Sequence, residues 1–197
     1  MSKIVGEPEG ATPLDPNEMA GLVFKHIQTR GQLDELEQVN IQAGMKWLMR
    51  QKKADPFTEQ FVCELHKRLF GQVWDWAGSF RKTGKNIGCD AIQIGIELRN
   101  LLDDARYWVE HDTYPAKELA ARFHHRLVAI HPFPNGNGRH SRIMADVVLT
   151  IAMGEKPIDW SGGQSLQAMS EQRKKYISAL RAADKGDYEP LFKYVGA

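Results

Sequence analysis

Between two apolar helical patterns lies His131-Pro-Phe-Pro-Asn-Gly-Asn-Gly-Arg-His-Ser-Arg142. The pattern before it puts apolar side chains on one face of a helix, namely Leu119, Phe123, Leu127 and Ile130. Pro132 disfavours helical geometry at His131, so this helix is expected to end there. A second helix is expected to begin at Arg139, and its strongly apolar continuation from Ile143 to Met153 is typical of the centre of a helical bundle.

The rest of the chain shows helical periodicity with one exception. Helices are expected at residues 17–27, 32–50, 58–71, 96–111, 115–130, 166–183 and 188–195. The exception is the segment from Arg81 to Ile94, where turn-forming residues stand among isoleucines and predict a short hairpin. The expected fold class is therefore all-α, a helical bundle with one small β-hairpin.

The length of 197 residues fits one large structural domain. Residues 1–16 are rich in Gly, Pro and Glu and are expected to form a flexible N-terminal arm. Residues 17–56 are expected to form N-terminal helices, and residues 57–197 the main domain. No repeat, linker or shift in composition divides the chain.

The charge balance excludes some classes of partner. Lys and Arg total 26 and Asp and Glu total 25, so no general field attracts nucleic acid or an anionic membrane. Neither a signal peptide nor a membrane span is expected, which predicts a cytoplasmic protein. Cys63 and Cys89 are expected to be reduced thiols, because two cysteines do not make a disulfide framework.

The glycine-rich turn before Arg139 predicts a local anion site. Two glycines and two asparagines within residues 134–138 tolerate positive φ, and a helix N-terminus directly after them presents unpaired N–H groups. Arg139 and Arg142 lie three residues apart on one face of that helix. Two cations there oppose the helix dipole unless an anion lies between them, and guanidinium groups bind phosphate in a forked geometry.

Together these features predict phosphoryl or nucleotidyl transfer, with His131 taking the proton of an attacking hydroxyl. Taken singly, His131 fits a packed or capping histidine, the glycines fit an ordinary turn, and the arginines fit a solvated face. Their occurrence in this order favours the transferase. The other histidines nearby are interpreted as structural or solvated, because no acidic residue accompanies them at metal-ligand spacing: His124, His125 and His140.

The segment 131–142 resembles the signature of the Fic family, His-Pro-Phe-x-Asp/Glu-Gly-Asn-Gly-Arg-x-x-Arg. The resemblance extends from about Phe57 to Tyr194. It includes Trp76-Ala-Gly-Ser-Phe-Arg81, which is similar to the lead-in to the family's flap, and Tyr176-Ile-Ser-Ala-Leu-Arg-Ala-Ala-Asp184, which is similar to its C-terminal helix. The chain as a whole most resembles the bacterial subgroup called mobile mystery protein B.

The resemblance implies a Fic fold and the transfer of AMP from ATP to a Ser, Thr or Tyr hydroxyl of a target protein. It implies that His131 is the general base. The α- and β-phosphates would be held by the backbone amides of Gly136, Asn137 and Gly138, and the phosphate tail neutralised by Arg139 and Arg142. The hairpin, with Lys85, Asn86, Ile87 and Gly88, would be the flap that aligns the target by strand addition.

One position departs from the family signature. Asn135 stands where the family has Asp or Glu, the carboxylate that holds Mg²⁺ against the phosphates. An amide oxygen is a weaker ligand for a hard dication. Three outcomes stay open: Mg²⁺ or Mn²⁺ held mainly by phosphates and water, a slower enzyme, or a different donor. We favour chemistry that still depends on the metal ion but is weakened.

Many family members are inhibited by a glutamate that pairs with the second arginine, here Arg142. The N-terminal candidate is Glu37, although the Ser/Thr and Gly/Asn that accompany such a glutamate are missing around it. A solvated helix charge is an equal interpretation of Glu37. The expectation is that Glu37 restrains Arg142.

Other functions remain open beside protein adenylylation. A Fic fold could use another phosphate-containing donor, because the motif binds phosphates rather than the base. A nucleotide-binding protein with little turnover is a further alternative, favoured by Asn135. Family analogy also suggests a regulatory partner protein, as in toxin–antitoxin pairs, and a homodimer is among the partners considered.

Overall fold

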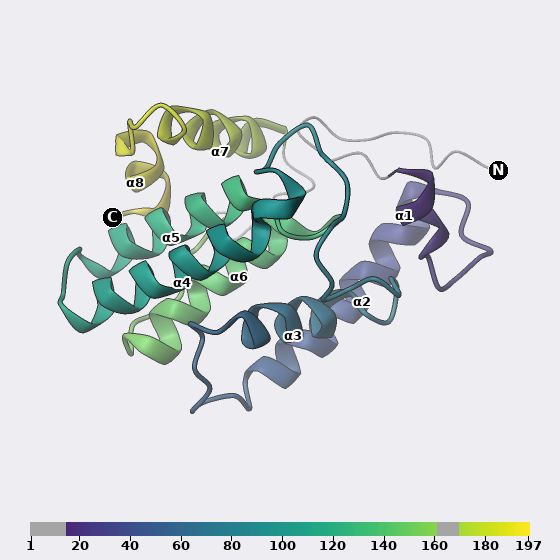
Figure 1. The fold of residues 1–197 in the computed structure, drawn as a ribbon, viewed down its shortest axis with the longest axis horizontal. Helices are drawn as coiled ribbons and strands as arrows, with labels where there is room; N and C mark the ends of the chain where they lie inside the picture. Colours follow the sequence, from purple (N-terminus) through teal and green to yellow (C-terminus); the bar gives the residue numbers. More distant parts are fainter. Residues whose placement is uncertain (1–14, 161–169) are drawn as a thin grey trace.

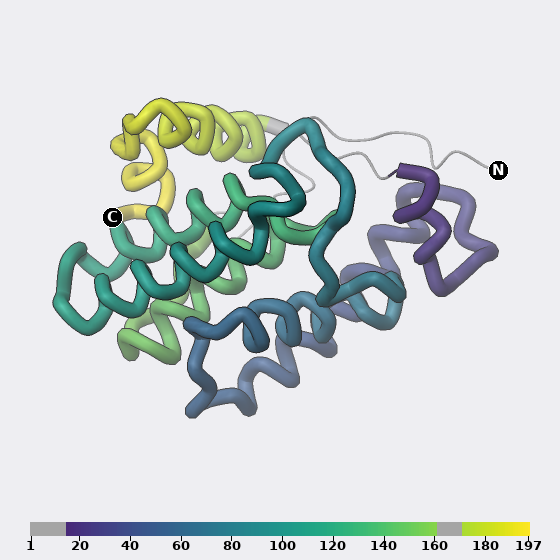
Figure 2. Tube along the Cα trace, in the orientation of Figure 1, coloured from purple at the N-terminus to yellow at the C-terminus, as the bar shows by residue number. Residues whose placement is uncertain are grey.

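The computed structural model describes residues 15–160 and 170–197. Within these ranges the chain is helical, and Figures 1 and 2 show the helices in their spatial arrangement. The helices are α1 (Pro16–Ala20), α2 (Arg30–Leu48), α3 (Glu59–Phe70), α4 (Ile94–Glu110), α5 (Ala116–Ile130), α6 (Asn137–Val147), α7 (Ser170–Ala183) and α8 (Glu189–Val195). A 3₁₀ turn, Ala91–Gln93, leads into α4, and a π-helical turn, Val148–Ala152, continues α6.

The core lies around α5 and α6, as the apolar pattern on both sides of the motif predicts. Helices α4, α5 and α6 run side by side, α7 and α8 cover one side of them, and α2 and α3 pack together on the other (Figure 1). The side chains at the centre are fully buried, among them Leu65, Leu98, Leu119, Leu127, Met144 and Leu149. The all-α bundle is confirmed.

Local capping explains where several helices begin. Thr29 caps α2 in a reciprocal arrangement with Gln32, and Thr58 caps α3 through the backbone N–H of Phe61. Asp15 and Glu18 form the same reciprocal arrangement at α1. The helix expected at residues 17–27 is wrong in extent, because α1 ends at Ala20 and the chain turns at Gly21.

The expected hairpin at 81–94 is also wrong. Residues 81–90 form an irregular segment without strand structure, and the only bridge between the parts of the chain that are described joins Leu22 to Trp74. The backbone carbonyls of Thr83 and Cys89 accept hydrogen bonds from the Arg81 guanidinium. A buried side chain therefore satisfies acceptors that a strand partner would satisfy in a hairpin.

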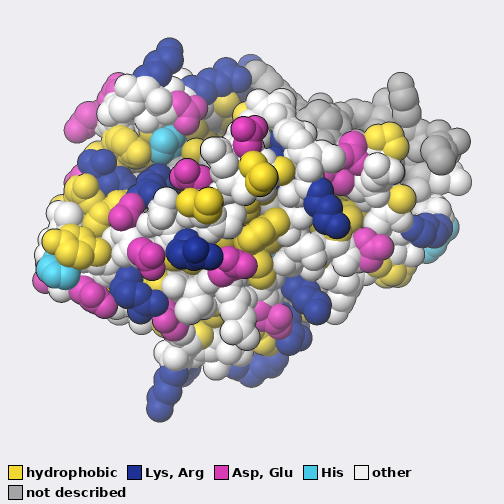
Figure 3. Space-filling view, in the orientation of Figure 1, with side chains coloured by type: hydrophobic (Ala, Val, Ile, Leu, Met, Phe, Trp, Pro, Cys, Tyr) yellow, Lys and Arg dark blue, Asp and Glu magenta, His cyan; other side chains and the backbone are white. Residues whose placement is uncertain are grey.

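Some expectations fall on residues that the structure does not describe. The arm expected for residues 1–16 lies outside the described ranges except for its last two residues, and so does the start of the helix expected at 166–183. Within those ranges, no helix is long and apolar enough to cross a membrane. Basic and acidic side chains are interspersed over the face shown in Figure 3, in keeping with the near-neutral charge balance.

Candidate active site

His131 occupies a sharp turn at the end of α5. The helix ends at Ile130, and His131 has φ 54° and ψ 59°, the left-handed region, while its backbone N–H still donates to Leu127. This conformation is uncommon outside glycine, and Pro132 helps to impose it because the residue before proline avoids the right-handed helix. The helix end predicted at this position is confirmed. The His131 side chain is only 4% exposed.

Asn137 fixes the turn that follows. Its side-chain oxygen accepts from the backbone N–H of Phe133 at 2.9 Å, and its side-chain nitrogen donates to the Phe133 carbonyl at 2.7 Å. Both polar atoms of this buried amide are thus used to close one loop. The backbone between His131 and the start of α6 is held in a single shape by this pair of bonds.

The loop delivers the N-terminus of α6. Gly136 has φ 76°, and a Cβ there would lie 2.8 Å from the Phe70 ring, so the position requires glycine both for conformation and for space. By position, the first N–H groups of α6 have no helical acceptor. A Cβ on Gly138 would meet only the Arg142 guanidinium, at 3.8 Å, so this backbone is open to a close approach.

His66 supports the same loop from beneath, a role that the sequence did not reveal. Its Nδ1 accepts from the Gly78 N–H at 3.0 Å, which leaves Nε2 to donate to the Asn135 carbonyl at 3.0 Å. The ring is fully buried and stacks on Phe133 with centroids 3.7 Å apart. Burial, then the nearby His140, holds the pKa of His66 well below its ordinary value, so the ring is neutral.

Arg81 is a second organising residue whose role was missed. It is 2% exposed, and its Nε donates to the His131 carbonyl at 2.6 Å while Nη2 reaches the Ile130 carbonyl at 3.3 Å. The backbone N–H of Arg81 also donates to the Pro132 carbonyl at 2.9 Å. Arg81 therefore ties the segment after α3 to the end of α5.

The two arginines of the motif flank the first turn of α6. The Arg139 guanidinium lies over the Phe70 ring, 4.9 Å from its centroid, on the side of α2 and α3. Arg142 lies over the Tyr176 ring of α7 at 5.3 Å. Both guanidinium groups border the helix N-terminus, as an anion site there requires.

Glu37 contacts the first arginine instead of the second. Its Oε2 lies 2.7 Å from Nη1 of Arg139, and its Oε1 accepts from the indole N–H of Trp74 at 2.8 Å. The carboxylate is buried, so the interpretation of Glu37 as a solvated charge is wrong. The expected contact with Arg142 is also wrong: α2 packs on α3, so its buried face meets the Arg139 side of α6, whereas Arg142 faces α7.

The environment of His131 keeps the imidazole neutral. Burial, the Arg81 guanidinium and the Lys85 ammonium together lower the pKa of His131 to about 4, against a hydrogen bond with the Val128 backbone that raises it. A neutral ring at physiological pH can accept a proton, which a general base must do.

At the position where the family signature has its metal ligand, the side chain of Asn135 is turned onto its own loop. Its side-chain oxygen accepts from the backbone N–H of Gly136 at 2.6 Å. In the described part of the chain, no group of three His, Cys, Asp or Glu side chains could hold a metal ion. These described residues do not form a metal-binding set by themselves.

The remaining histidines near the motif are structural. His124 bonds to the Tyr176 hydroxyl at 2.9 Å, and His140 bonds to the Val62 carbonyl at 3.0 Å. His125 lies between Asp184 and the hydroxyl of Tyr188, at 2.8 and 2.9 Å. All three are buried in contacts between helices, which resolves the open choice between a structural and a solvated role.

The end of α5 and the start of α6 thus carry an imidazole, an open helix N-terminus and two guanidinium groups, a set of groups whose chemistry suits a phosphate-containing ligand. Comparison with known proteins shows which family the chain resembles. Residues 56–149, just under half of the chain, match the Fic/DOC family.

Relatives and solved structures agree with this assignment. The chain is 29% identical over 171 residues to the protein adenylyltransferase Fic of Aedes aegypti (83% of the chain, 32% of the relative). It is 29% identical over 180 residues to that of Drosophila melanogaster (86% and 35%). The chain thus spans about a third of the length of these relatives.

Solved structures share the fold. BepC of Bartonella tribocorum, solved with bound AMPPNP, has a TM-score of 0.71 at 18% identity and covers 92% of this chain and 96% of its own. Fic-1 of C. elegans has a TM-score of 0.68 at 24% identity and covers 89% and 51%.

Proposed function

We propose that the chain is a protein adenylyltransferase that moves AMP from ATP to a Ser, Thr or Tyr hydroxyl of a target protein. The observation that carries the proposal is the joint position of His131 and the α6 N-terminus, with Arg139 and Arg142 on its two sides. The adenylyltransferase relatives support it, although the chain matches only about a third of each.

The reaction requires one proton acceptor and one anion site. The target hydroxyl oxygen attacks the α-phosphorus of ATP and forms a new P–O bond, while the bond to the β-phosphate oxygen breaks and pyrophosphate leaves. His131 takes the hydroxyl proton. The N–H groups of Gly136, Asn137 and Gly138, with Arg139 and Arg142, would stabilise the charge on the phosphates.

The test is transfer of label from ATP that carries it on the α-phosphate. Wild-type protein should label itself or an added target, and His131→Ala should lose the label by at least about a hundredfold, the contribution expected of a general base. His111→Ala is the matched control, since His111 is exposed on the far end of α4. Equal labelling by His131→Ala and wild type would contradict the proposal.

A different donor is the second candidate within the same chemistry. The α6 N-terminus and the two arginines suit phosphates and do not by themselves select adenine. UTP, CTP, GTP and a phosphocholine donor, each competing with labelled ATP, separate these cases. A nucleotide-binding protein with little turnover is favoured by Asn135 and by the burial of His131, and binding without transfer in every variant would establish it.

Mg²⁺ or Mn²⁺ would accompany the nucleotide, with ligands from the phosphates and water. Asn135→Asp restores the carboxylate of the family signature and should lower the Mg²⁺ concentration needed for half-maximal labelling. An unchanged Mg²⁺ dependence would show that position 135 does not contact the ion. The cytoplasmic location, the regulatory partner, the homodimer and the subgroup of mobile mystery protein B stay predictions, and so does the alignment of a target by Lys85, Asn86, Ile87 and Gly88.

A further inference from the structure

Residues 82–90, which we call the strap, run from Arg81 to the turn before α4. Arg81 holds both ends of the strap, because its Nη1 donates to the Thr83 carbonyl at 2.8 Å and its Nη2 donates to the Cys89 carbonyl. Between these points the backbone has glycine at 84 and at 88, and Gly88 has φ 110°. The strap is therefore a loop with fixed ends and permissive residues next to each end.

The Gly88 end of the strap packs against His131. A Cβ on Gly88 would lie 2.7 Å from Cβ of His131 and 3.3 Å from the Ile130 carbonyl, so the strap backbone is in direct contact with the imidazole-bearing residue. His131 is 4% exposed beneath it, although most side chains of the strap are themselves exposed. While the strap lies in this position, it limits the access of a hydroxyl of another protein to the imidazole.

Helix α1 clamps the strap from its outer side. The Glu18 carboxylate pairs with the Lys85 ammonium, and the two side chains are 10% and 5% exposed. The Thr83 hydroxyl lies 3.4 Å from Glu18 and 3.2 Å from Asp15. Lys85 is the one strap residue whose charge is buried, and Glu18 is the carboxylate that holds it there.

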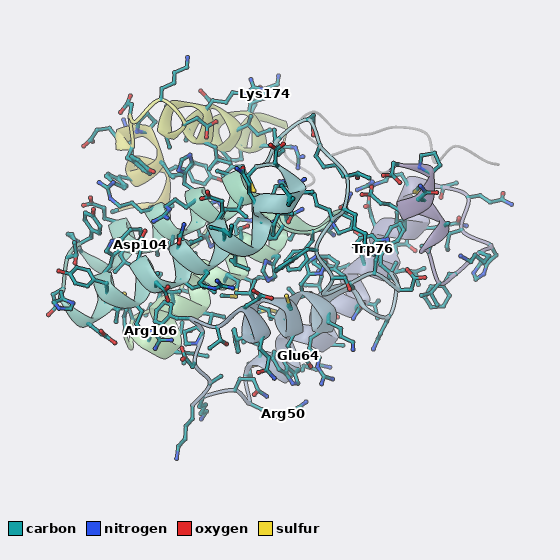
Figure 4. The ribbon with its side chains drawn as sticks, viewed as in Figure 1. Arg50, Glu64, Trp76, Asp104, Arg106 and Lys174 are labelled. Carbon is teal, nitrogen blue, oxygen red and sulfur yellow. The ribbon has the colours of Figure 1, made fainter. Side chains whose placement is uncertain are left out.

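Glu18 is itself held in place. Its Oε2 accepts from the Asp15 backbone N–H at 2.9 Å, in the reciprocal cap of α1, and its carbonyl accepts from the indole N–H of Trp76 at 2.9 Å. Trp76 lies at the end of the molecule that carries α1 (Figure 4). A five-residue helix thus joins the strap to the connection after α3 through one residue, whose side chain binds Lys85 and whose backbone carbonyl binds Trp76.

We propose that Glu18 is a positioning residue that acts through Lys85 to hold the strap closed over His131, and that breaking this ion pair opens the site to the target protein. Removing one partner of a buried ion pair leaves the other charge desolvated, which is strongly unfavourable. The strap can relieve that cost by swinging Lys85 into water about its two glycines. The effect on transfer rests on the proposed function, but the opening itself does not.

The opening can be measured at His131 without any activity. Diethylpyrocarbonate acylates neutral imidazole, and His131 is neutral near pH 6.5 because burial and Arg81 keep its pKa low, so protonation does not protect the ring and its reactivity follows its coverage. Peptide mass spectrometry follows each histidine separately, with the exposed His26 and His111 as internal standards. Glu18→Gln should raise the acylation rate of His131 by about tenfold or more relative to these standards.

Two further variants make the measurement decisive. Lys85→Met removes the pair from the strap side and leaves the strap itself without a buried charge that would move into water, so it should raise the rate by a smaller factor. Glu35→Gln changes an exposed glutamate on α2 and should leave it unchanged. If Glu18→Gln does not fold by circular dichroism, Lys85→Met decides alone. An unchanged His131 rate in the folded variants would overturn the proposal.

Labelling with α-labelled ATP separates this proposal from the proposed function. With both correct, Glu18→Gln should raise the rate of self-labelling and leave the KM for ATP unchanged, because the phosphate loop is untouched. If acylation of His131 becomes faster but no variant transfers label, the proposed adenylyltransferase activity is wrong and the proposal about the strap is supported. If the wild type transfers label but Glu18→Gln changes neither the acylation rate of His131 nor the labelling rate, the adenylyltransferase is supported and the proposal about the strap is wrong.

Discussion

At the scale of single residues, the buried carboxylate of Glu37 neutralises the Arg139 guanidinium, which the positive end of the α6 dipole would otherwise destabilise. Arg139 sits in the first turn of α6, where a cation is unfavourable, and Glu37 lies 2.7 Å from it. A nucleotide phosphate would compete with Glu37 for the same guanidinium. Glu37 is therefore placed to oppose binding of an anion at this helix N-terminus.

Replacing Glu37 should release Arg139. We expect Glu37→Gly to bind ATP about tenfold more tightly and to label itself faster, because Glu37 no longer competes with the phosphates for Arg139. A tenfold change corresponds to about 1.4 kcal/mol, which is a modest part of the free energy of a buried charge pair. Calorimetric titration with ATP gives the affinity. Glu35→Gly is the matched control, since it places the same glycine in α2 at an exposed site. Equal affinities in the two variants would exclude a role for Glu37 at Arg139.

The lowered pKa of His131 makes a prediction about pH. Because burial, Arg81 and Lys85 bring this pKa to about 4, the base is deprotonated over the whole range above pH 5. The kcat/KM for labelling should then be flat from pH 7.5 to pH 5.5, where an ordinary histidine would already have lost most of its activity. Lys85→Met removes one of the causes and should move the acid limb to higher pH. A limb near pH 6.5 in the wild type would contradict this.

At the scale of elements, the turn between α5 and α6 depends on a glycine that no other residue can replace. Gly136→Ala would put a Cβ 2.8 Å from the Phe70 ring and force alanine to φ 76°. Strain and clash together should cost about 2 kcal/mol or more of unfolding free energy. Urea denaturation measures it. Gly95→Ala is the control, because a Cβ there meets nothing within 4 Å, and alanine in a helix should stabilise by about 0.5 kcal/mol or more.

Elements set by local chemistry could be predicted from the sequence, and those set by distant contacts could not. Pro132 and the glycines at 136 and 138 act on their own backbone, so the end of α5 and the start of α6 were expected at nearly the right positions. The strap was expected to be a hairpin because its turn formers resemble one. Its actual shape depends on Arg81, which lies outside the turn and also binds the end of α5, about fifty residues away in the chain.

The candidate site divides in the same way. The base, the phosphate loop and the two arginines lie within twelve consecutive residues, so the pattern alone brings them together. The sequence around His66 does not reveal its role, because His66 is one of several residues on the buried face of α3. The partner of Glu37 depends on how α2 packs on α3 beside the start of α6, and spacing along the chain does not contain that arrangement.

At the scale of the whole molecule, buried histidines join the helices. His124 connects α5 to α7 through Tyr176, and His140 connects α6 to α3 through the Val62 carbonyl. Burial lowers the pKa of each to about 3. The packing of the bundle therefore depends on neutral imidazoles, which water would protonate in the unfolded chain below pH 6.5.

This dependence predicts a loss of stability in mild acid. Below pH 6.5 the unfolded chain binds protons that folded His124 and His140 refuse, so the unfolding free energy should fall by about 1.4 kcal/mol per pH unit for each. Asp146 acts in the opposite direction between about pH 4 and pH 6, because burial raises its pKa to about 6 and its folded form holds a proton that the unfolded form releases. His66 and His131, whose pKa values burial also lowers, act in the same direction as His124 and His140, so the histidines outweigh one carboxyl and the net slope keeps its sign. Urea denaturation from pH 7.5 to pH 5 should show it, His140→Gln should reduce the slope, and exposed His111→Gln should not. A stability that is flat across this range would mean that the histidines are not buried as neutral rings.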